Sequence, residues 1–100
     1  MSDEAPQDTA TRITEAGRRA VATTASLADL TALETTLLGK KSELSLARRA
    51  LGSMDPDRRK EAGAAFNATR EALVEAIEAR RAELAEAELR ATLDAEALDL

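Results

Sequence analysis

The most constraining feature of this sequence is a long stretch, residues 56–97, that contains nothing able to stop a helix. Asp55 can cap the first free amides, and Pro56 suits the first helical position because an amide proton there would have no partner. Gly63 is the weak position, since a glycine costs about 1 kcal/mol relative to alanine in a helix. A helix of about 40 residues is about 60 Å long, whereas a globule of about 100 residues has a radius of gyration of about 13 Å. The helix therefore needs a partner of similar length.

Residues 26–51 supply that partner as a limb of two shorter helices. Ser26 can cap the first of them and Ser42 the second. A turn at residues 52–55 then folds the limb back, so residues 26–98 are expected to form an antiparallel helical hairpin, a coiled-coil arm. The seam along the long helix is drawn through apolar residues at coiled-coil spacings, which are Phe66, Leu73, Ile77, Leu84, Ala91 and Leu98.

The first quarter of the chain carries a weaker helical signal. Residues 1–8 contain a proline and three acids without periodic apolar residues, so a disordered tail is predicted there. Over residues 9–25, Ile13 and several small residues at helical spacing predict a short additional N-terminal helix. This spacing leaves open whether the helix packs on the hairpin. The chain has 23 Ala and 14 Leu against two Val, two Ile, one Phe and no Tyr or Trp, which argues against strands and predicts an all-α fold.

The residue types that are missing exclude much of enzyme chemistry. The chain contains no His and no Cys, so a Ser-His-Asp relay, a thiolate nucleophile and a zinc site built on His or Cys are excluded. Glu71, Glu75 and Glu78 are near neighbours on one helix, and without a histidine they are interpreted as a solvated face. We therefore assign no catalytic residue and no metal ligand. The acidic first residues and the lack of a long apolar run predict a cytoplasmic protein without membrane contact.

The charges are segregated along the chain. The net charge is −5, yet residues 40–60 contain seven Lys and Arg against three acids, while residues 83–100 contain one Arg against six acids. Because the hairpin turns at residues 52–55, the basic block is expected to form a basic tip. Such a patch suits phosphate oxygens, and the chain has too few aromatic residues to stack on many bases. The candidate contacts to nucleic acid are Lys40, Lys41, Arg48, Arg49, Arg58, Arg59, Lys60 and Arg70.

Each of these side chains also has a purely structural interpretation. The lysines after Gly39 suit the end of a helix through the helix dipole, and arginines such as Arg70 can cover the seam with their apolar stems. For the cations at residues 58–60 an external anion is an equal alternative, because positive charge is disfavoured in the first turn of a helix. Gly63 and Asn67, one turn apart, could contact RNA, but a close helix approach and a hydrogen bond across the seam are the favoured interpretation.

Several short motifs occur in order along most of the chain. They are Leu-Gly-Lys-Lys at residues 38–41 with Glu43 and Leu44, Asp-Pro-Asp-Arg-Arg at residues 55–59, Gly63 with Asn67 and Arg70, Ala79–Arg80 with Glu83–Leu84, and Ala-Leu-Asp-Leu at residues 97–100. In this order and spacing they resemble the N-terminal domain of the alpha subunit of bacterial phenylalanyl-tRNA synthetase. Two positions depart from the family pattern, since Ser42 stands where the family usually has Gly and Leu37 where it often has Tyr.

The resemblance implies a coiled-coil arm of a cytoplasmic enzyme with two alpha and two beta subunits, and this arm would hold tRNA(Phe) during aminoacylation. ATP and magnesium would bind a class II catalytic domain whose motifs this chain lacks, so no cofactor is expected in this segment. The chain alone is expected to be a monomer or a weak dimer. Two alternatives stay open: a coiled coil for protein interaction or dimerisation, and the helical arm of another synthetase such as the seryl enzyme.

Overall fold

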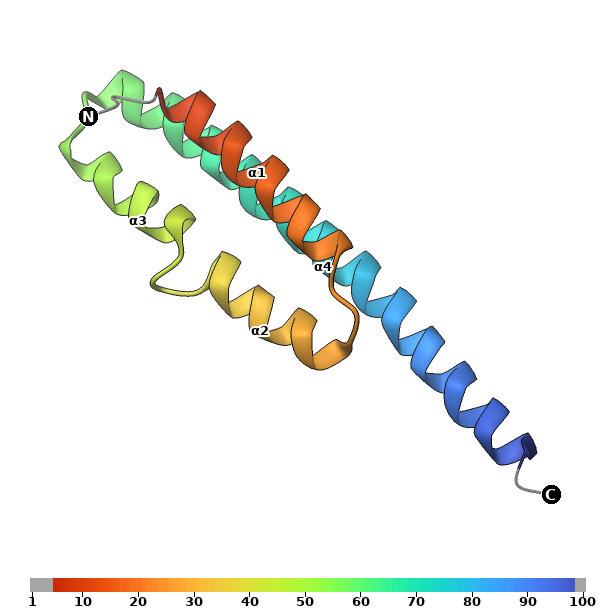
Figure 1. Cartoon of the computed structure of the whole chain (residues 1–100). Coiled ribbons are helices and arrows are strands. Elements are labelled where there is room, and N and C mark those ends of the chain that lie inside the picture. Colours follow the sequence, from red (N-terminus) through yellow and green to blue (C-terminus); the bar gives the residue numbers. More distant parts are fainter. Residues whose placement is uncertain (1–4, 99–100) are drawn as a thin grey trace.

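Between residues 5 and 98 the chain folds into a rod of four α-helices and one turn of 3-10 helix (Figure 1). The computed structural model describes the backbone of residues 5–98 and the side chains of residues 5–96, and this part contains no strand. The rod measures 68 × 21 × 18 Å. Its elements are α1 (Pro6–Ala22), α2 (Leu27–Leu38), α3 (Glu43–Ala50), η1 (Leu51–Ser53) and α4 (Pro56–Leu98). The predicted all-α fold is confirmed.

The predicted antiparallel hairpin is formed by α2 and α3 on one side and α4 on the other (Figure 1). Contacts along the two limbs fall in opposite order, as antiparallel helices require. Arg48 of α3 donates to Asn67 of α4 at 3.1 Å, whereas Glu34, earlier in the chain, accepts from Arg81, later in α4, at 2.9 Å. The limb is broken between α2 and α3, at residues 39–42.

The N-terminal helix α1 packs on the hairpin and runs parallel to α4 (Figure 1). The Thr14 hydroxyl donates to the Thr69 hydroxyl at 2.9 Å, and farther along α4 Arg80 donates to the carbonyl of Thr24, just past the end of α1, at 2.5 Å. Most of the rod is therefore three helices thick, and α1 is part of its core.

The bounds of α1 differ from those that the sequence predicts. The helix begins at Pro6 instead of residue 9, so the predicted tail is too long by residues 6–8; residues 1–4 of that tail lie outside the described part. Proline suits this first position because its fixed φ is already helical. The helix ends at Ala22 instead of residue 25. The hydroxyls of Thr23 and Thr24 donate to carbonyls of its last turn, at 2.8 and 2.7 Å, and so compete with further helical bonds.

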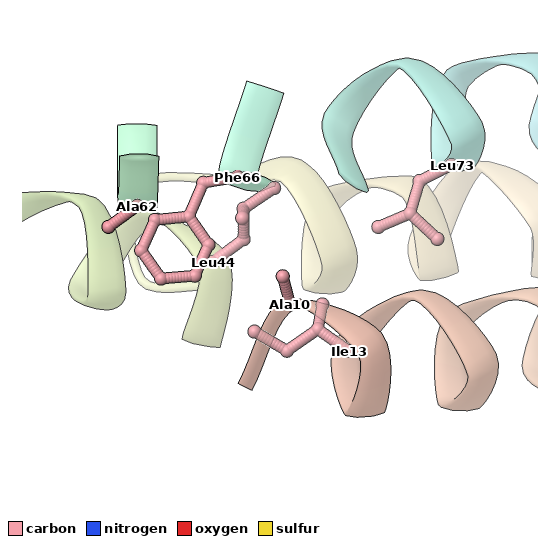
Figure 2. Packing of buried hydrophobic residues seen from close by; sticks show 6 residues of the cluster. All are labelled: Ala10, Ile13, Leu44, Ala62, Phe66 and Leu73. Atoms are coloured by element: carbon pink, nitrogen blue, oxygen red, sulfur yellow. The ribbon is translucent and has the colours of Figure 1, made fainter. Parts of the chain in front are cut away.

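The core consists of two apolar clusters that follow one another along the rod. In the first, side chains from α1, α3 and α4 point toward one another (Figure 2). Its largest members are Phe66 and Leu73, which are 2% and 0% exposed. The buried members of the first cluster are Ala10, Ile13, Leu44, Ala62, Phe66 and Leu73, and those of the second are Val21, Leu30, Ile77 and Leu84. The predicted seam is thus correct as far as Leu84.

The helix starts that the sequence marks are confirmed. The Ser26 hydroxyl accepts the Asp29 amide at 3.1 Å, and the Ser42 hydroxyl accepts the Ser45 amide at 3.2 Å. These bonds satisfy backbone amides that have no partner within the helix. The long helix starts at Pro56, as predicted.

Beyond Leu84 the seam ends, and the prediction of a buried Ala91 is wrong. The physical reason is that α2 begins at Leu27, whose amide lies 3.4 Å from a carboxylate oxygen of Glu88, so no other helix of residues 5–98 reaches past this level. The side chain of Leu98 lies outside the described part. We call residues 85–98 the extension (Figure 1). None of the helices between residues 5 and 98 is long and apolar enough to cross a membrane.

Candidate nucleic-acid interface

The structure divides the eight candidate cations into two groups. The first, which we call the tip group, surrounds the turn between α3 and α4 and comprises Arg48, Arg49, Arg58, Arg59 and Lys60. The second, which we call the linker group, comprises Lys40, Lys41 and Arg70. All eight side chains are exposed. The sequence predicts one basic tip, and the structure brings only the first group to it.

The separation of the two groups follows from the length of α3. Its 8 residues, at about 1.5 Å each, place Lys40 and Lys41 about 12 Å or more from the tip. Arg70 follows Asn67, the partner of Arg48, by about one helical turn in the direction away from the tip, so we place it in the linker group. The cations therefore extend along part of the hairpin instead of forming one compact patch.

Hydrogen bonds hold the linker that carries Lys40 and Lys41. The Gly39 amide donates to the Thr35 carbonyl at 2.9 Å and ends α2. The Ser42 hydroxyl donates to the Gly39 carbonyl at 2.7 Å, and Ser42 is 4% exposed. A side chain at residue 39 would press against the Thr35 carbonyl, so glycine is required there. Serine at position 42, where the family usually has glycine, thus acts as the cap of α3 and fixes the linker.

Two members of the tip group already have protein partners. Arg48 donates to the Asn67 side chain at 3.1 Å, which confirms the predicted hydrogen bond across the hairpin. Arg59 donates to the Met54 carbonyl at 3.2 Å. The close approach predicted at Gly63 is wrong, because a Cβ there would lie 3.9 Å from Leu51 Cδ1, an ordinary contact.

Ion pairing separates the candidate cations from most other arginines. None of the eight forms an ion pair within residues 5–96, although Asp55, Asp57 and Glu61 are near the tip in sequence. Of the remaining six arginines, Arg18 and Arg19 of α1 likewise form none in the described part. The other four are paired, as Arg12–Glu43, Arg80–Glu83, Arg81–Glu34 and Arg90–Glu86.

The sequence alone does not indicate that Arg18 and Arg19 form no ion pair in the described part. Which arginines find a carboxylate depends on distant parts of the chain, since Glu34 and Arg81 are 47 residues apart. Charge counts along the sequence carry no signal for such pairs. In the described residues no three acidic side chains are placed to hold a metal ion, so we assign no magnesium site to them.

The fold and the charge pattern define an elongated helical domain with cations exposed along one half. Residues 25–93 match the family described as "Aminoacyl tRNA synthetase class II, N-terminal domain", and the chain belongs to this family. The match covers α2, α3 and most of α4, which confirms the resemblance seen in the sequence motifs.

The chain is also similar to curated proteins named phenylalanine–tRNA ligase alpha subunit. It is 42% identical to that of Rhodospirillum rubrum over 81 residues, which cover 81% of this chain and 23% of the relative. The chain is 44% identical to the protein of Rhodopseudomonas palustris over 80 residues, which cover 80% of this chain and 22% of the relative. The identity to the protein of Chromobacterium violaceum is 41% over 88 residues, which cover 88% of this chain and 27% of the relative. The chain thus spans about a quarter of the length of these relatives.

Proposed function

We propose that this chain is the tRNA-binding arm of a phenylalanyl-tRNA synthetase alpha subunit and that its exposed cations hold the phosphate backbone of tRNA(Phe). Family membership and the names of the relatives support the subunit assignment. In this proposal the cytoplasmic enzyme also contains a beta subunit. ATP, magnesium and phenylalanine are bound by parts of the enzyme outside this chain, and the arm takes part in no bond making or breaking.

The observation that carries the proposal is that none of the eight candidate cations forms an ion pair within the described residues. An exposed lysine or arginine without a carboxylate partner can bind a phosphate and release the counterions condensed on the nucleic acid. A cation that already pairs with a carboxylate of the protein gains less free energy from binding a phosphate. The unpaired cations of the hairpin therefore favour a polyanion as the partner.

The shape of the surface supports recognition of the RNA backbone. The linker group and the tip group extend along the hairpin, so a long RNA surface can contact both. The single aromatic residue, Phe66, is 2% exposed and is held in the core. Without exposed aromatic side chains the arm cannot stack on bases, and it reads the charge and shape of the RNA.

The test is a titration of fluorescently labelled tRNA(Phe) with the chain and three charge-reversal variants. Lys40→Glu/Lys41→Glu changes the linker group, and Arg58→Glu/Lys60→Glu changes the tip group. Arg48 and Arg59 are left intact because they bond Asn67 and the Met54 carbonyl. The matched control is Arg18→Glu/Arg19→Glu on α1, which alters the net charge equally and also removes two unpaired cations.

We expect the unaltered chain to bind with a dissociation constant on the order of 10–100 μM near physiological salt. Each double reversal in the two groups should weaken binding at least about tenfold and lower the salt dependence by about two phosphate contacts. The control should change binding by less than about threefold, and circular dichroism should show all four proteins folded.

Two results would contradict this assignment. Equal weakening by the control would mean that net charge, and not the two groups, governs binding. If the chain does not bind tRNA at low salt and light scattering gives the mass of a dimer, the chain is instead a dimerisation module.

A further inference from the structure

The extension of α4 projects beyond the start of α2, which it meets at Glu88, the acceptor of the Leu27 amide (Figure 1). Residue 84 is the last buried position of α4, and residues 85–96 are exposed. Among these lie two of the three large apolar side chains that the described residues expose, Leu89 at 59% and Leu93 at 54%. Large apolar side chains that are exposed to water on one segment of a helix can mark an interaction surface.

The helical register shows that the core cannot cover these leucines. Leu89 and Leu93 are four residues apart and share one face of α4. They follow Leu84, the last core residue, by five and nine positions, which at about 100° per residue turns them about 140° and 180° away from it. This face, which we call the Leu89–Leu93 face, therefore points away from the side on which α1 and α2 pack.

The charges around this face argue against a second copy as its partner. Glu86 precedes Leu89 by three residues and Glu96 follows Leu93 by three, so both acids flank the leucines. Arg90 already pairs with Glu86 at 3.1 Å. Two extensions laid side by side would bring their flanking carboxylates together, and like charges at an interface disfavour association. The complementary partner is an apolar surface rimmed by lysine or arginine.

The relatives indicate where such a partner comes from. This chain covers 22% to 27% of their lengths, so about three quarters of each relative lies outside the matched segment. The family match runs to residue 93 and so includes both leucines. A surface on the same polypeptide is present at a high effective concentration, and docking needs only a modest intrinsic affinity.

We propose that the Leu89–Leu93 face docks on the body of the synthetase subunit, which is the part of the polypeptide that in the relatives lies outside this domain. The docking surface on the body is apolar and carries lysine or arginine opposite Glu96, since Glu86 already pairs with Arg90. Docking fixes the direction in which the arm leaves the enzyme. The inference rests on the subunit assignment of the proposed function and is independent of whether the cations bind RNA.

Hydrogen exchange tests this docking. The free chain is compared with a chimera in which it replaces the matched segment of the Rhodospirillum rubrum subunit. Amides of residues 86–96 should exchange at least about tenfold more slowly in the chimera, because docking suppresses local opening. Leu89→Ser/Leu93→Ser should return their exchange to the rate in the free chain.

The matched control is Leu46→Ser compared with Leu93→Ser, since both leucines are 54% exposed and only Leu93 lies on the proposed face. Leu46→Ser should leave the slow exchange intact. Exchange over residues 86–96 that is equal in the free chain and the chimera would overturn the docking. So would a dimer of the free chain that Leu89→Ser/Leu93→Ser dissociates.

A second measurement covers the case of a chimera that fails to fold. The same exchange comparison is then made on the intact Rhodospirillum rubrum subunit, with serine at the positions aligned with residues 89 and 93. Unchanged exchange there would also overturn the proposal. Binding of tRNA by the free chain carrying Leu89→Ser/Leu93→Ser should be unaltered, so a failure of the RNA assignment stays distinguishable from a failure of docking.

Discussion

The two parts of α4 form one continuous helix and yet have opposite surroundings. Residues 56–84 pack against α1, α2 and α3, whereas residues 85–96 bury no side chain and meet the start of α2 at Glu88, whose carboxylate accepts from the Leu27 amide at 3.4 Å. Both parts are rich in alanine and acidic residues and contain no proline after Pro56. The comparison shows that helix formation here depends on local sequence, whereas burial depends on what lies opposite.

The packed part of α4 also buries a polar side chain between two helices. Thr69 is 2% exposed, and its hydroxyl donates to the carbonyls of Ala10 and Ala65 at 3.2 Å each as alternatives, while it accepts from Thr14 at 2.9 Å. A buried hydroxyl without partners would be destabilising. Three-helix packing thus includes a polar contact between α1 and α4 within an apolar seam.

The largest effect that this comparison predicts is for leucine truncations at two positions on α4. Leu73→Ala should lower the free energy of unfolding by about 2–4 kcal/mol, because Leu73 is fully buried and truncation leaves a cavity. Leu93→Ala, the same change in the extension, should alter it by less than about 0.5 kcal/mol. Urea unfolding followed by circular dichroism measures both. Equal losses would show that the extension is packed in solution.

A smaller effect is expected at the break between α2 and α3. Ser42→Ala removes the cap of α3 and the bond to the Gly39 carbonyl, so it should cost about 1–2 kcal/mol. Ser53→Ala is the control, because its exposed hydroxyl only donates to the carbonyl of Ala50 at 2.9 Å. Urea unfolding followed by circular dichroism measures the free energy of unfolding of both variants. A harmless Ser42→Ala would mean that the linker is not held by this serine.

Gly17 offers a test of how closely α1 approaches α4. A Cβ at residue 17 would overlap Leu73 Cδ2, so Gly17→Ala should cost about 1 kcal/mol despite the better helix propensity of alanine. With Leu73→Ala in the background the overlap disappears, and the same change should stabilise by about 1 kcal/mol. A double-mutant cycle measures this reversal in the sign of the change in unfolding free energy. Additive effects of the two substitutions would show that the two positions do not touch.

Local signals account for most of the fold that could be predicted. The Asp55–Pro56 start and the serine caps at Ser26 and Ser42 involve atoms a few residues apart, so sequence alone indicates them. The packing of α1 could not be predicted with the same ease. Its buried residues are Ala10, Ile13, Gly17 and Val21, and the two small ones among them reveal their burial only when a neighbouring helix is in place.

The candidate interface could be predicted only in part, for a related reason. The sequence indicates which residues are cationic and that the chain turns near residue 54. It does not indicate that α3 separates Lys40 and Lys41 from the tip, because this depends on a break whose geometry is set by Gly39 and Ser42. It also cannot indicate which arginines are neutralised, since those pairs join distant segments.

The smallest predicted effect compares two ion pairs, one from each part of α4. Arg81 and Glu34 join α4 to α2 at 2.9 Å, and their side chains are 33% and 39% exposed. Arg90 and Glu86 pair within the extension at 3.1 Å, and theirs are 76% and 66% exposed. An exposed pair is weak because water and salt screen it, whereas a partly buried pair between helices is screened less.

Glu34→Gln should therefore lower the free energy of unfolding by about 0.5 kcal/mol at low salt, and Glu86→Gln by less than about 0.2 kcal/mol. Both variants remove one negative charge, so the change in net charge is matched. In about 1 M salt the Debye length falls to about 3 Å, and the loss for Glu34→Gln should shrink toward that for Glu86→Gln. If the two variants behave alike at low salt, contact with α2 does not strengthen the pair, and the difference between the two parts of α4 rests on apolar packing alone.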